Sequence, residues 1–318
     1  MDFLRLLVPL RTPFWDAVFQ GITFLGEETL FLVFAMVFFW CIDKRHGYFL
    51  LYVALLGASV NQFLKLIFCV PRPWVLDEEF PIVESARSAA TGYSFPSGHT
   101  QSAGGLFLGI GRLYHRTALR IVCIMVTLLV GFSRMYLGVH TPADVLTSLG
   151  VATLLVLLSA PLFHRAWTGS WKWYLPLMGA LFAVLAAGIV YVECCPLPVN
   201  AIPAYSVDGK GTLYKMLGAS VGYALVLWLD TRFIRFDTKA VWWAQIVKVA
   251  LGLALVVGVR LLTKDPLLQL CGGHSIAGSI RYFLMILLGG AVWPLTFRFF
   301  ARLGKGKTAA TQSVQPAD

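Results

Sequence analysis

The sequence has 318 residues, of which 58% are hydrophobic and only 13% are charged, whereas soluble domains carry about a quarter charged residues. This composition excludes an ordinary soluble enzyme, and continuous apolar windows of about twenty residues predict a polytopic membrane protein. The net charge is +10. In a membrane protein an excess of Lys and Arg is typical of the cytoplasmic loops, so no nucleic-acid partner is expected.

The fold class follows from how backbone polar groups are satisfied in lipid. Only helices and closed barrels satisfy them, and the apolar windows are continuous rather than alternating, which favours helices. We therefore predict an all-α membrane helix bundle. Residues 1 to 23, which carry Arg5, Arg11 and Asp16 among apolar residues, are interpreted as an amphipathic segment at the membrane surface. Ordinary N-terminal packing is the alternative.

Nine membrane spans are predicted in chain order. They are Phe24–Ile42, Tyr48–Val70, Ser97–Leu113, Ala118–Leu137, Pro142–Phe163, Leu175–Val192, Leu213–Leu229, Val241–Leu262 and Tyr282–Phe300. More than half of the 26 Lys and Arg residues fall in the loops after the first, third, fifth and seventh spans and after the ninth. Since cytoplasmic loops carry an excess of Lys and Arg, the N-terminus is expected outside and the C-terminus inside.

Three groups of polar residues converge on the predicted outer side, where ionisable groups at membrane depth indicate function. They are Lys65 with Arg72; the run Pro96-Ser97-Gly98-His99; and Ser133, Arg134, His140 and Asp144.

The first property of these groups is an excess of positive charge. Lys65 and Arg72 lie seven residues apart and share a helix face, and Arg134 comes from a neighbouring span. Three cations around one point repel one another unless a multivalent anion lies between them, and phosphate fits this role. Ser97 and Gly98 begin a helix whose free N–H groups also favour an anion.

The second property is a pair of histidines. His140 and Asp144 are four residues apart at a helix start, so the carboxylate can orient one imidazole nitrogen and leave the other free to attack. His99, beside the anion, can donate a proton, and two such histidines suffice to cleave a phosphomonoester. We see no obvious carboxylate cluster for Mg²⁺, so we expect no metal and no cofactor.

Each residue also has an ordinary structural interpretation. Lys65 and Arg72 could extend to the membrane interface, Ser97 could be an N-cap, and Thr141 with Asp144 matches a capping box. His140 alone could be a structural histidine. Their joint occurrence on one membrane side favours a site.

These motifs resemble those of the type-2 phosphatidic acid phosphatase superfamily of integral-membrane lipid phosphate phosphatases. The family pattern of Lys-x6-Arg-Pro, Pro-Ser-Gly-His and Ser-Arg-x5-His-x3-Asp is present in order and without departure. The resemblance implies a six-helix core, a phosphohistidine intermediate and no metal. It implies His140 as nucleophile, Asp144 as its orienting carboxylate and His99 as general acid. It assigns phosphate binding to Lys65, Arg72, Ser97, Gly98, Arg134 and, as a further member, Ser133.

The nine-span layout is similar to sphingoid-base phosphate phosphatases and glucose-6-phosphatases. Short stretches that include "LGEE" at 25–28 and "KMLGASVGYAL" at 215–225 carry this similarity, although Gly218 and Gly222 could simply be a GxxxG packing motif. We predict a phosphatase core over residues 1–165, a three-helix extension over 166–304 and a disordered tail over 305–318.

Two outer loops lie on the predicted catalytic side. Cys271 could pair with Cys194 or Cys195 across them, or all three could be reduced. Apolar residues in these loops could form a lid that suits a lipid, or the loops could only connect spans. These residues are Leu197, Val199, Ile202, Tyr205, Leu267 and Leu268.

The leading functional hypothesis is a membrane phosphatase that cleaves a polyprenyl, phosphatidate, phosphatidylglycerophosphate or sphingoid phosphate at the extracytoplasmic face. A sugar-phosphate phosphatase of the glucose-6-phosphatase type is the alternative, and a non-catalytic anion-binding membrane protein is a third. The expected partners are a lipid phosphate substrate and membrane lipids. Compact loops favour a bacterial plasma membrane over an organelle, and no oligomeric state is predicted.

Overall fold

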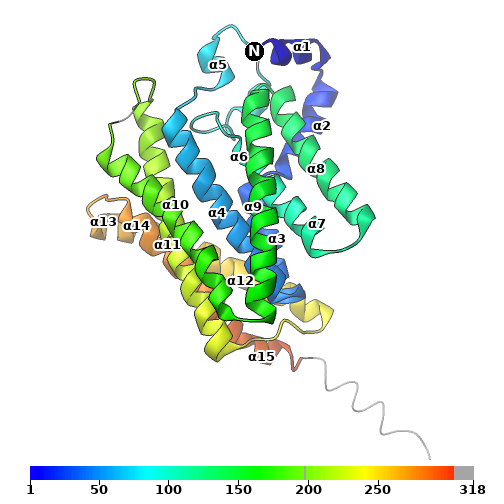
Figure 1. Cartoon of the computed structure of the whole chain (residues 1–318), viewed down its shortest axis with the longest axis vertical. Helices are drawn as coiled ribbons and strands as arrows, with labels where there is room; N and C mark the ends of the chain where they lie inside the picture. Colours follow the sequence, from blue (N-terminus) through cyan, green and yellow to red (C-terminus); the bar gives the residue numbers. More distant parts are fainter. Residues whose placement is uncertain (197, 304–318) are drawn as a thin grey trace, which may run out of the picture. The chain divides into compact units, whose positions relative to one another are not determined.

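The computed structural model describes residues 1–196 and 198–303, and this part of the chain contains helices and no strands. The prediction of an all-α membrane bundle is confirmed (Figure 1). The fifteen α-helices have these bounds: α1 Asp2–Leu7, α2 Pro13–Phe24, α3 Glu28–Val37, α4 Lys44–Phe68, α5 Pro73–Leu76, α6 Gly98–Ala103, α7 Gly109–Leu113, α8 Thr117–Tyr136, α9 Pro142–Thr168, α10 Tyr174–Cys194, α11 Pro203–Leu229, α12 Trp242–Leu262, α13 Lys264–Leu270, α14 Ile276–Leu287 and α15 Phe297–Phe300.

The number of candidate spans differs from the nine predicted. Within the described residues, seven helical segments are long and apolar enough to cross a membrane. The pair formed by Pro13–Phe24 and Glu28–Ile42, bent by 45°, raises the number to eight. Thus α2, predicted to lie at the surface, belongs to a candidate broken span. The protein is a multi-pass membrane protein.

The remaining predicted span, Ser97–Leu113, is helical but short. It consists of α6, a π-helical turn at Gly104–Leu108 and α7, with six, five and five residues. At 1.5 Å per residue these make a helix of about 24 Å, which is shorter than the ~30 Å hydrocarbon core.

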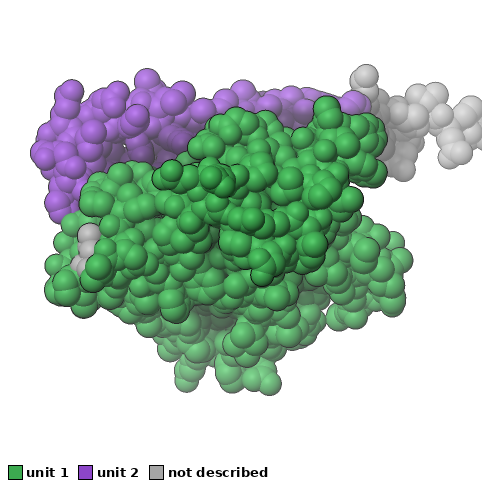
Figure 2. Space-filling model, turned by 90° about the horizontal axis from the view of Figure 1, so that it is seen from above, with its two compact units in different colours: residues 1–35, 49–217 green, residues 36–48, 218–318 purple. Residues whose placement is uncertain are grey.

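The chain forms two compact units, coloured separately in Figure 2. Unit 1 comprises residues 1–35 and 49–217, and unit 2 comprises residues 36–48 and 218–318. The predicted division near residue 165 stays a prediction. The two compact units divide the chain within α3, α4 and α11. The predicted tail at 305–318 lies outside the described residues.

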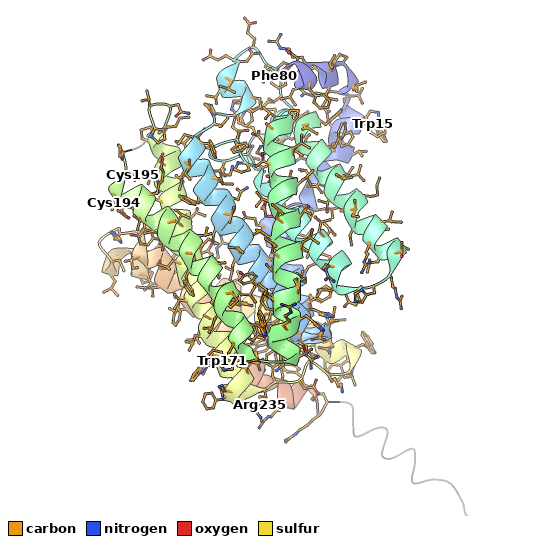
Figure 3. All side chains as sticks on the ribbon, viewed as in Figure 1. Trp15, Phe80, Trp171, Cys194, Cys195 and Arg235 are labelled. Atoms are coloured by element: carbon orange, nitrogen blue, oxygen red, sulfur yellow. The ribbon has the colours of Figure 1, made fainter. Side chains whose placement is uncertain are left out.

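Unit 1 places aromatic side chains at both of its ends. The exposed Trp15 and the buried Phe80 lie near one end, opposite the exposed Trp171 at the other (Figure 3). This distribution is typical of the two membrane interfaces. Between them, Phe163 packs edge-on against Phe49 and Tyr174 in the helix core.

Unit 2 contains an ion pair with a buried carboxylate, and a buried indole. Lys44 Nζ lies 2.9 Å from Asp230 Oδ2, whose side chain is fully buried. Trp40 Nε1 donates to the carbonyl of Gly289 at 3.0 Å. All six cysteines are free in the structure, so the predicted bridge from Cys271 is not formed in it.

The GxxxG interpretation of Gly218 and Gly222 agrees with the packing of α11 on α14. A Cβ atom on Gly218 would lie 1.9 Å from the carbonyl oxygen of Ser279, and one on Gly222 would lie 3.0 Å from Ile286 Cβ. Small residues therefore allow these helices to approach closely, as expected for membrane packing.

We expect Gly218→Ala to destabilise the protein by at least the ~1–3 kcal/mol typical of overpacked cores, because the neighbouring atom is backbone and cannot rotate away. The matched control is Gly258→Ala in α12, where an added Cβ has open space. The measurement is the thermal unfolding midpoint in detergent. Equal midpoints for the two variants would contradict this packing.

Candidate active site

The residues of the three predicted motifs come together at one end of unit 1. Here α4 and α8 end and α6 and α9 begin (Figure 1). Helix α6 packs against both α8 and α9, so segments far apart in the sequence share one buried site. The predicted convergence is therefore present in the structure.

His140 and Asp144 form a buried pair in the turn before α9 and in its first turn. His140 Nδ1 lies 3.3 Å from Asp144 Oδ2, and both side chains are at most 2% exposed. The same carboxylate oxygen accepts from Ser94 Oγ at 2.5 Å and from the Thr141 N–H at 2.8 Å. The capping box is also present, so Asp144 both caps α9 and contacts the imidazole.

Arg72 fixes the other side of the imidazole. Its Nη1 lies 2.9 Å from His140 Nε2 and donates to the Val139 carbonyl at 3.0 Å. Its Nε and Nη2 donate to the carbonyls of Gly92 and Thr91 at 3.0 and 2.7 Å. Since a guanidinium can only donate, Nε2 is the acceptor, and we assign the proton of the neutral ring to Nδ1, toward Asp144.

The electrostatic environment keeps this imidazole uncharged. Burial, together with the positive charges of Arg72, Arg134 and Lys65, lowers the pKa of His140 well below its usual value. Desolvation and like charges both disfavour the charged form. His140 is therefore neutral at pH 7, which is the form that can act as a nucleophile.

Arg134 has unused donors inside the protein. Its side chain is fully buried, and Nη1 donates to Thr23 Oγ1 at 2.9 Å. Its Nε and Nη2 have no partner in the described part of the chain. Buried polar atoms are almost always hydrogen-bonded, so two unsatisfied donors on a buried cation point to an anionic ligand.

Lys65 joins the same cluster from α4. That helix ends at Phe68 and Arg72 precedes α5, so the prediction that Lys65 and Arg72 share a helix face is wrong. Its ammonium donates to the carbonyl of Tyr93, in the loop that also carries Ser94. Within residues 1–196 and 198–303, no ion pair is formed by Lys65, Arg72 or Arg134. Three buried cations without a carboxylate ion pair leave an excess of positive charge for a ligand to neutralise.

The start of α6 partly matches its predicted role. Ser97 is the N-cap, and its hydroxyl accepts from the Thr100 N–H at 3.4 Å. Its own N–H donates to the Asp144 carbonyl at 3.2 Å, so this group is used by the fold. A Cβ on Gly98 would meet only Asn61 Oδ1, at 3.9 Å, which leaves the first turn open to a ligand.

His99 has a partner that the sequence analysis did not assign to the site. Its Nε2 lies 3.2 Å from Glu27 Oε1, in the bend between α2 and α3. The bend is held close, because a Cβ on Gly26 would lie 2.7 Å from the His99 carbonyl oxygen. Glu27 is part of the "LGEE" stretch. The similarity of this stretch to related families was the sequence signal that could have assigned Glu27 to the site.

Other predicted residues are less directly involved. The Ser133 hydroxyl donates to Val130 within its own helix at 2.7 Å, so its phosphate-binding role stays a prediction. Ser94 was missed, although it lies two residues before Pro96-Ser97-Gly98-His99. Among the apolar loop residues, Ile202 and Tyr205 pack around Tyr93, and Val199 is exposed. Leu197 lies outside the described residues.

Comparison with known proteins gives two matching family models. The model of the PAP2 superfamily matches residues 45–168. The model of the PAP2 superfamily phosphatase, transmembrane extension, matches residues 214–306. The chain belongs to the PAP2 superfamily. The predicted family resemblance is confirmed, and the buried His140 site lies within the first match. No solved structure gave a significant match.

Several curated relatives of this PAP2 chain are phosphatases. It is 28% identical over 235 residues to a probable sphingosine-1-phosphate phosphatase of Dictyostelium discoideum, covering 70% of this chain and 55% of the relative. It is 25% identical over 282 residues to human sphingosine-1-phosphate phosphatase 2, covering 82% and 67%. Undecaprenyl-diphosphatase BcrC of Bacillus subtilis is 32% identical over 113 residues, covering 36% and 55%. The chain thus spans little more than half of the first relative's length.

We expect inorganic phosphate to stabilise the wild-type protein against thermal unfolding, by about 2.7 kcal/mol at a concentration near 100 times its Kd. Arg134→Met should lose this stabilisation. Without phosphate, the variant should be at least as stable as wild type, because an unpaired buried charge has been replaced by an apolar side chain.

Chloride at matched ionic strength is the control for this measurement. Equal stabilisation of wild type and Arg134→Met by phosphate would show that the unused guanidinium donors do not bind the anion.

Proposed function

We propose that the protein is a metal-independent phosphatase that hydrolyses a lipid phosphate or diphosphate through a phosphohistidine intermediate. The observation that carries this proposal is the neutral, buried His140 beside three cations that form no ion pair in the described residues. Phosphoryl transfer needs positive charge around the equatorial oxygens and a nucleophile in line with the leaving group.

The first step breaks the bond between phosphorus and the leaving oxygen. His140 Nε2 attacks phosphorus, and His99 donates a proton to the leaving oxygen. Arg72 contacts Nε2 in the structure and would transfer its hydrogen bond to the phosphate as the ligand enters. Asp144 holds the proton on Nδ1 and stabilises the positive charge that the ring acquires.

The second step returns the protein to its starting state. A water molecule, deprotonated by His99, attacks phosphorus and breaks the bond to Nε2. Inorganic phosphate leaves, and His99 holds the proton needed for the next leaving group. Both steps use only residues of this chain, so neither requires a metal ion or a cofactor.

A lipid substrate is favoured over a sugar phosphate for two reasons. The names of the curated relatives refer to sphingoid and polyprenyl phosphates. In addition, apolar side chains surround the loop next to Lys65, where Ile202 and Tyr205 pack against Tyr93. A water-soluble sugar phosphate remains the second candidate, and a non-catalytic anion-binding protein the third. We propose that the site faces the extracytoplasmic side, from the predicted charge distribution of the loops. The compact loops favour a bacterial plasma membrane.

Replacing the nucleophile tests the proposal most directly. We expect His140→Ala to lower phosphate release on the order of 10³-fold or more, since the proposed covalent intermediate forms on this imidazole. His164→Ala, an exposed histidine near the end of α9, should retain wild-type turnover. Folding is checked by size-exclusion chromatography, and undiminished turnover in a folded His140→Ala protein would refute the assignment.

A substrate panel separates the candidate functions. Purified protein is given sphingosine-1-phosphate, undecaprenyl diphosphate and glucose 6-phosphate, and free phosphate is measured with and without EDTA. We expect turnover of at least one lipid that EDTA does not change. Preference for the sugar phosphate would support the second candidate, and loss of turnover in EDTA would contradict the metal-independent mechanism.

Glu27 is expected to position and stabilise the protonated form of His99. Glu27→Gln should therefore lower kcat for an alkyl phosphate by about 10- to 100-fold, a fraction of the ~10²–10⁴ that general acids contribute. An aryl phosphate, whose phenol leaves readily without a proton, should be much less affected. The control is Glu78→Gln, an exposed carboxylate in the loop after α5. Equal losses on both substrates would indicate a structural role only.

A further inference from the structure

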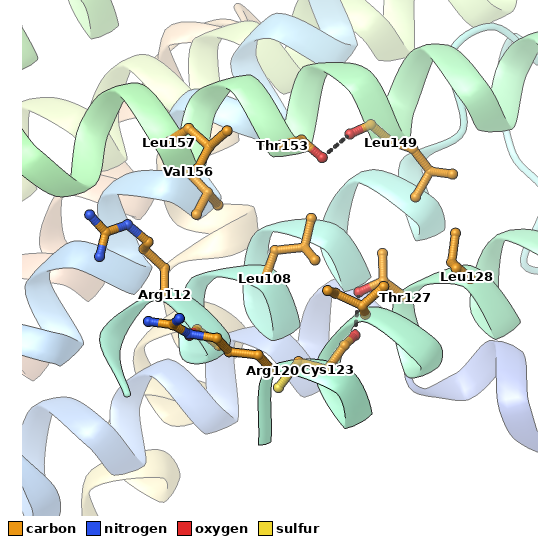
Figure 4. A pocket seen from close by; sticks show the side chains of 12 residues that line it. Leu108, Arg112, Arg120, Cys123, Thr127, Leu128, Leu149, Thr153, Val156 and Leu157 are labelled. Carbon is orange, nitrogen blue, oxygen red and sulfur yellow. Dashed lines mark hydrogen bonds between the residues drawn. The ribbon is translucent and has the colours of Figure 1, made fainter. Parts of the chain in front are cut away.

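A second concave feature of unit 1 lies away from the proposed active site. It is a cavity of about 600 Å³ between α7, α8 and α9 (Figure 4). Its walls are mostly aliphatic, and Ile124, Leu128 and Leu157 also face outward, with about half of each side chain exposed. Because these helices belong to a membrane bundle, the cavity is open to the hydrocarbon layer.

Two arginines lie at one end of this cavity. In Figure 4, Arg112 and Arg120 are grouped at one end, and Leu128 and Leu149 lie toward the other. Arg120 donates to the Gly111 carbonyl at 3.1 Å and lies 2.9 Å from His115 Nδ1. Neither arginine forms an ion pair in the part of the chain that the structure describes. This end of the cavity, which we call its mouth, therefore carries two uncompensated positive charges beside an apolar space.

The apolar space continues along the seam between α8 and α9. A second cavity of about 280 Å³ shares Leu128 and Leu149 with the first and extends to Met135 and Leu146. From Arg120 to Met135 the groove follows about 22 Å of helix, at 1.5 Å per residue. This exceeds half of the ~30 Å hydrocarbon core, so the groove can hold a long acyl chain.

The groove and the proposed active site use different parts of α8. Arg134 is near the end of this 20-residue helix, whereas Arg120 is in its first turn. Such a helix is about 30 Å long, which matches the hydrocarbon thickness. The two arginines of the groove thus lie toward the side of the membrane opposite to the one that holds His140.

We infer that this groove binds one anionic phospholipid from the leaflet opposite to the active site. The phosphate and the net negative headgroup are held by Arg112 and Arg120, and one acyl chain lies along the seam toward Leu146. Basic pockets between membrane helices are suited to anionic headgroups, and guanidinium groups bind phosphate oxygens in pairs. The charge at the mouth favours this ligand over a zwitterionic lipid or an apolar helix of a second copy.

The experiment is native mass spectrometry of the full-length protein in detergent, titrated with phosphatidylglycerol or phosphatidylcholine. We expect wild type to retain one phosphatidylglycerol in clear preference to phosphatidylcholine. Arg112→Gln and Arg120→Gln should each weaken that retention about five-fold. The control Arg116→Gln removes an exposed arginine at the same end that does not line the cavity, and should leave retention unchanged.

A second pair of variants tests the apolar part of the site. Thr153→Trp fills the cavity from its exposed edge and should abolish retention of both lipids, whereas Leu154→Trp, one residue along and outside the lining, should not. The proposal is overturned if phosphatidylglycerol is retained no better than phosphatidylcholine. It is also overturned if Arg112→Gln and Arg120→Gln behave as wild type, or if Thr153→Trp instead converts a dimer to a monomer. The experiment measures lipid retention and not turnover at His140, so its outcome is independent of the proposed function.

Discussion

The proposed site depends on one electrostatic constraint, the burial of three cations that form no ion pair. Removing a charge from water costs several kcal/mol even after relaxation, and Lys65, Arg72 and Arg134 are each at most 9% exposed. The fold offsets part of this cost through backbone carbonyls, which accept from Lys65 and from Arg72. The donors left on Arg134 are not offset, which supports the proposal that the site binds an oxyanion.

The same constraint explains the state of the histidine. A lone His140 beside Asp144 would be expected to gain affinity for a proton, because a carboxylate favours the charged ring. Here burial and the surrounding cations act in the opposite direction and lower the pKa of His140. The carboxylate also accepts from Ser94 and Thr141, which spreads its charge over several donors. The cations that would bind phosphate therefore also keep the nucleophile unprotonated.

Much of the site could be predicted from sequence because its residues lie in short, fixed spacings at helix ends. His140 and Asp144 are one helical turn apart, and Ser97 begins a helix, so their local geometry follows from the chain itself. Glu27 and Ser94 could not be found in this way. Each meets its partner through tertiary packing, at separations of 72 and 50 residues, and neither has a spacing that marks it.

The number of spans shows that prediction of the fold from sequence has the same limit. Hydropathy detects apolar windows, but it does not report whether a helix is long enough to cross or whether two short helices act together. The bend of 45° between α2 and α3 brings Glu27 to His99 and Thr23 to Arg134. The predicted first span, Phe24–Ile42, began after Thr23, and no bend was predicted in it. The hydropathy pattern could not indicate this bend, and yet the bend supplies Glu27 and Thr23 to the proposed site.

The helix α8 shows how one element can serve two chemical environments. Its inner face carries Val130, Gly131 and Arg134, all buried, whereas Leu128 and Met135 line the outer groove. An α-helix of 20 residues reaches from one membrane surface to the other, so positive charge at its two ends acts on anions of different leaflets. A lipid held at Arg120 would pack along α8, and would support the helix that positions the guanidinium of Arg134, which we propose binds phosphate.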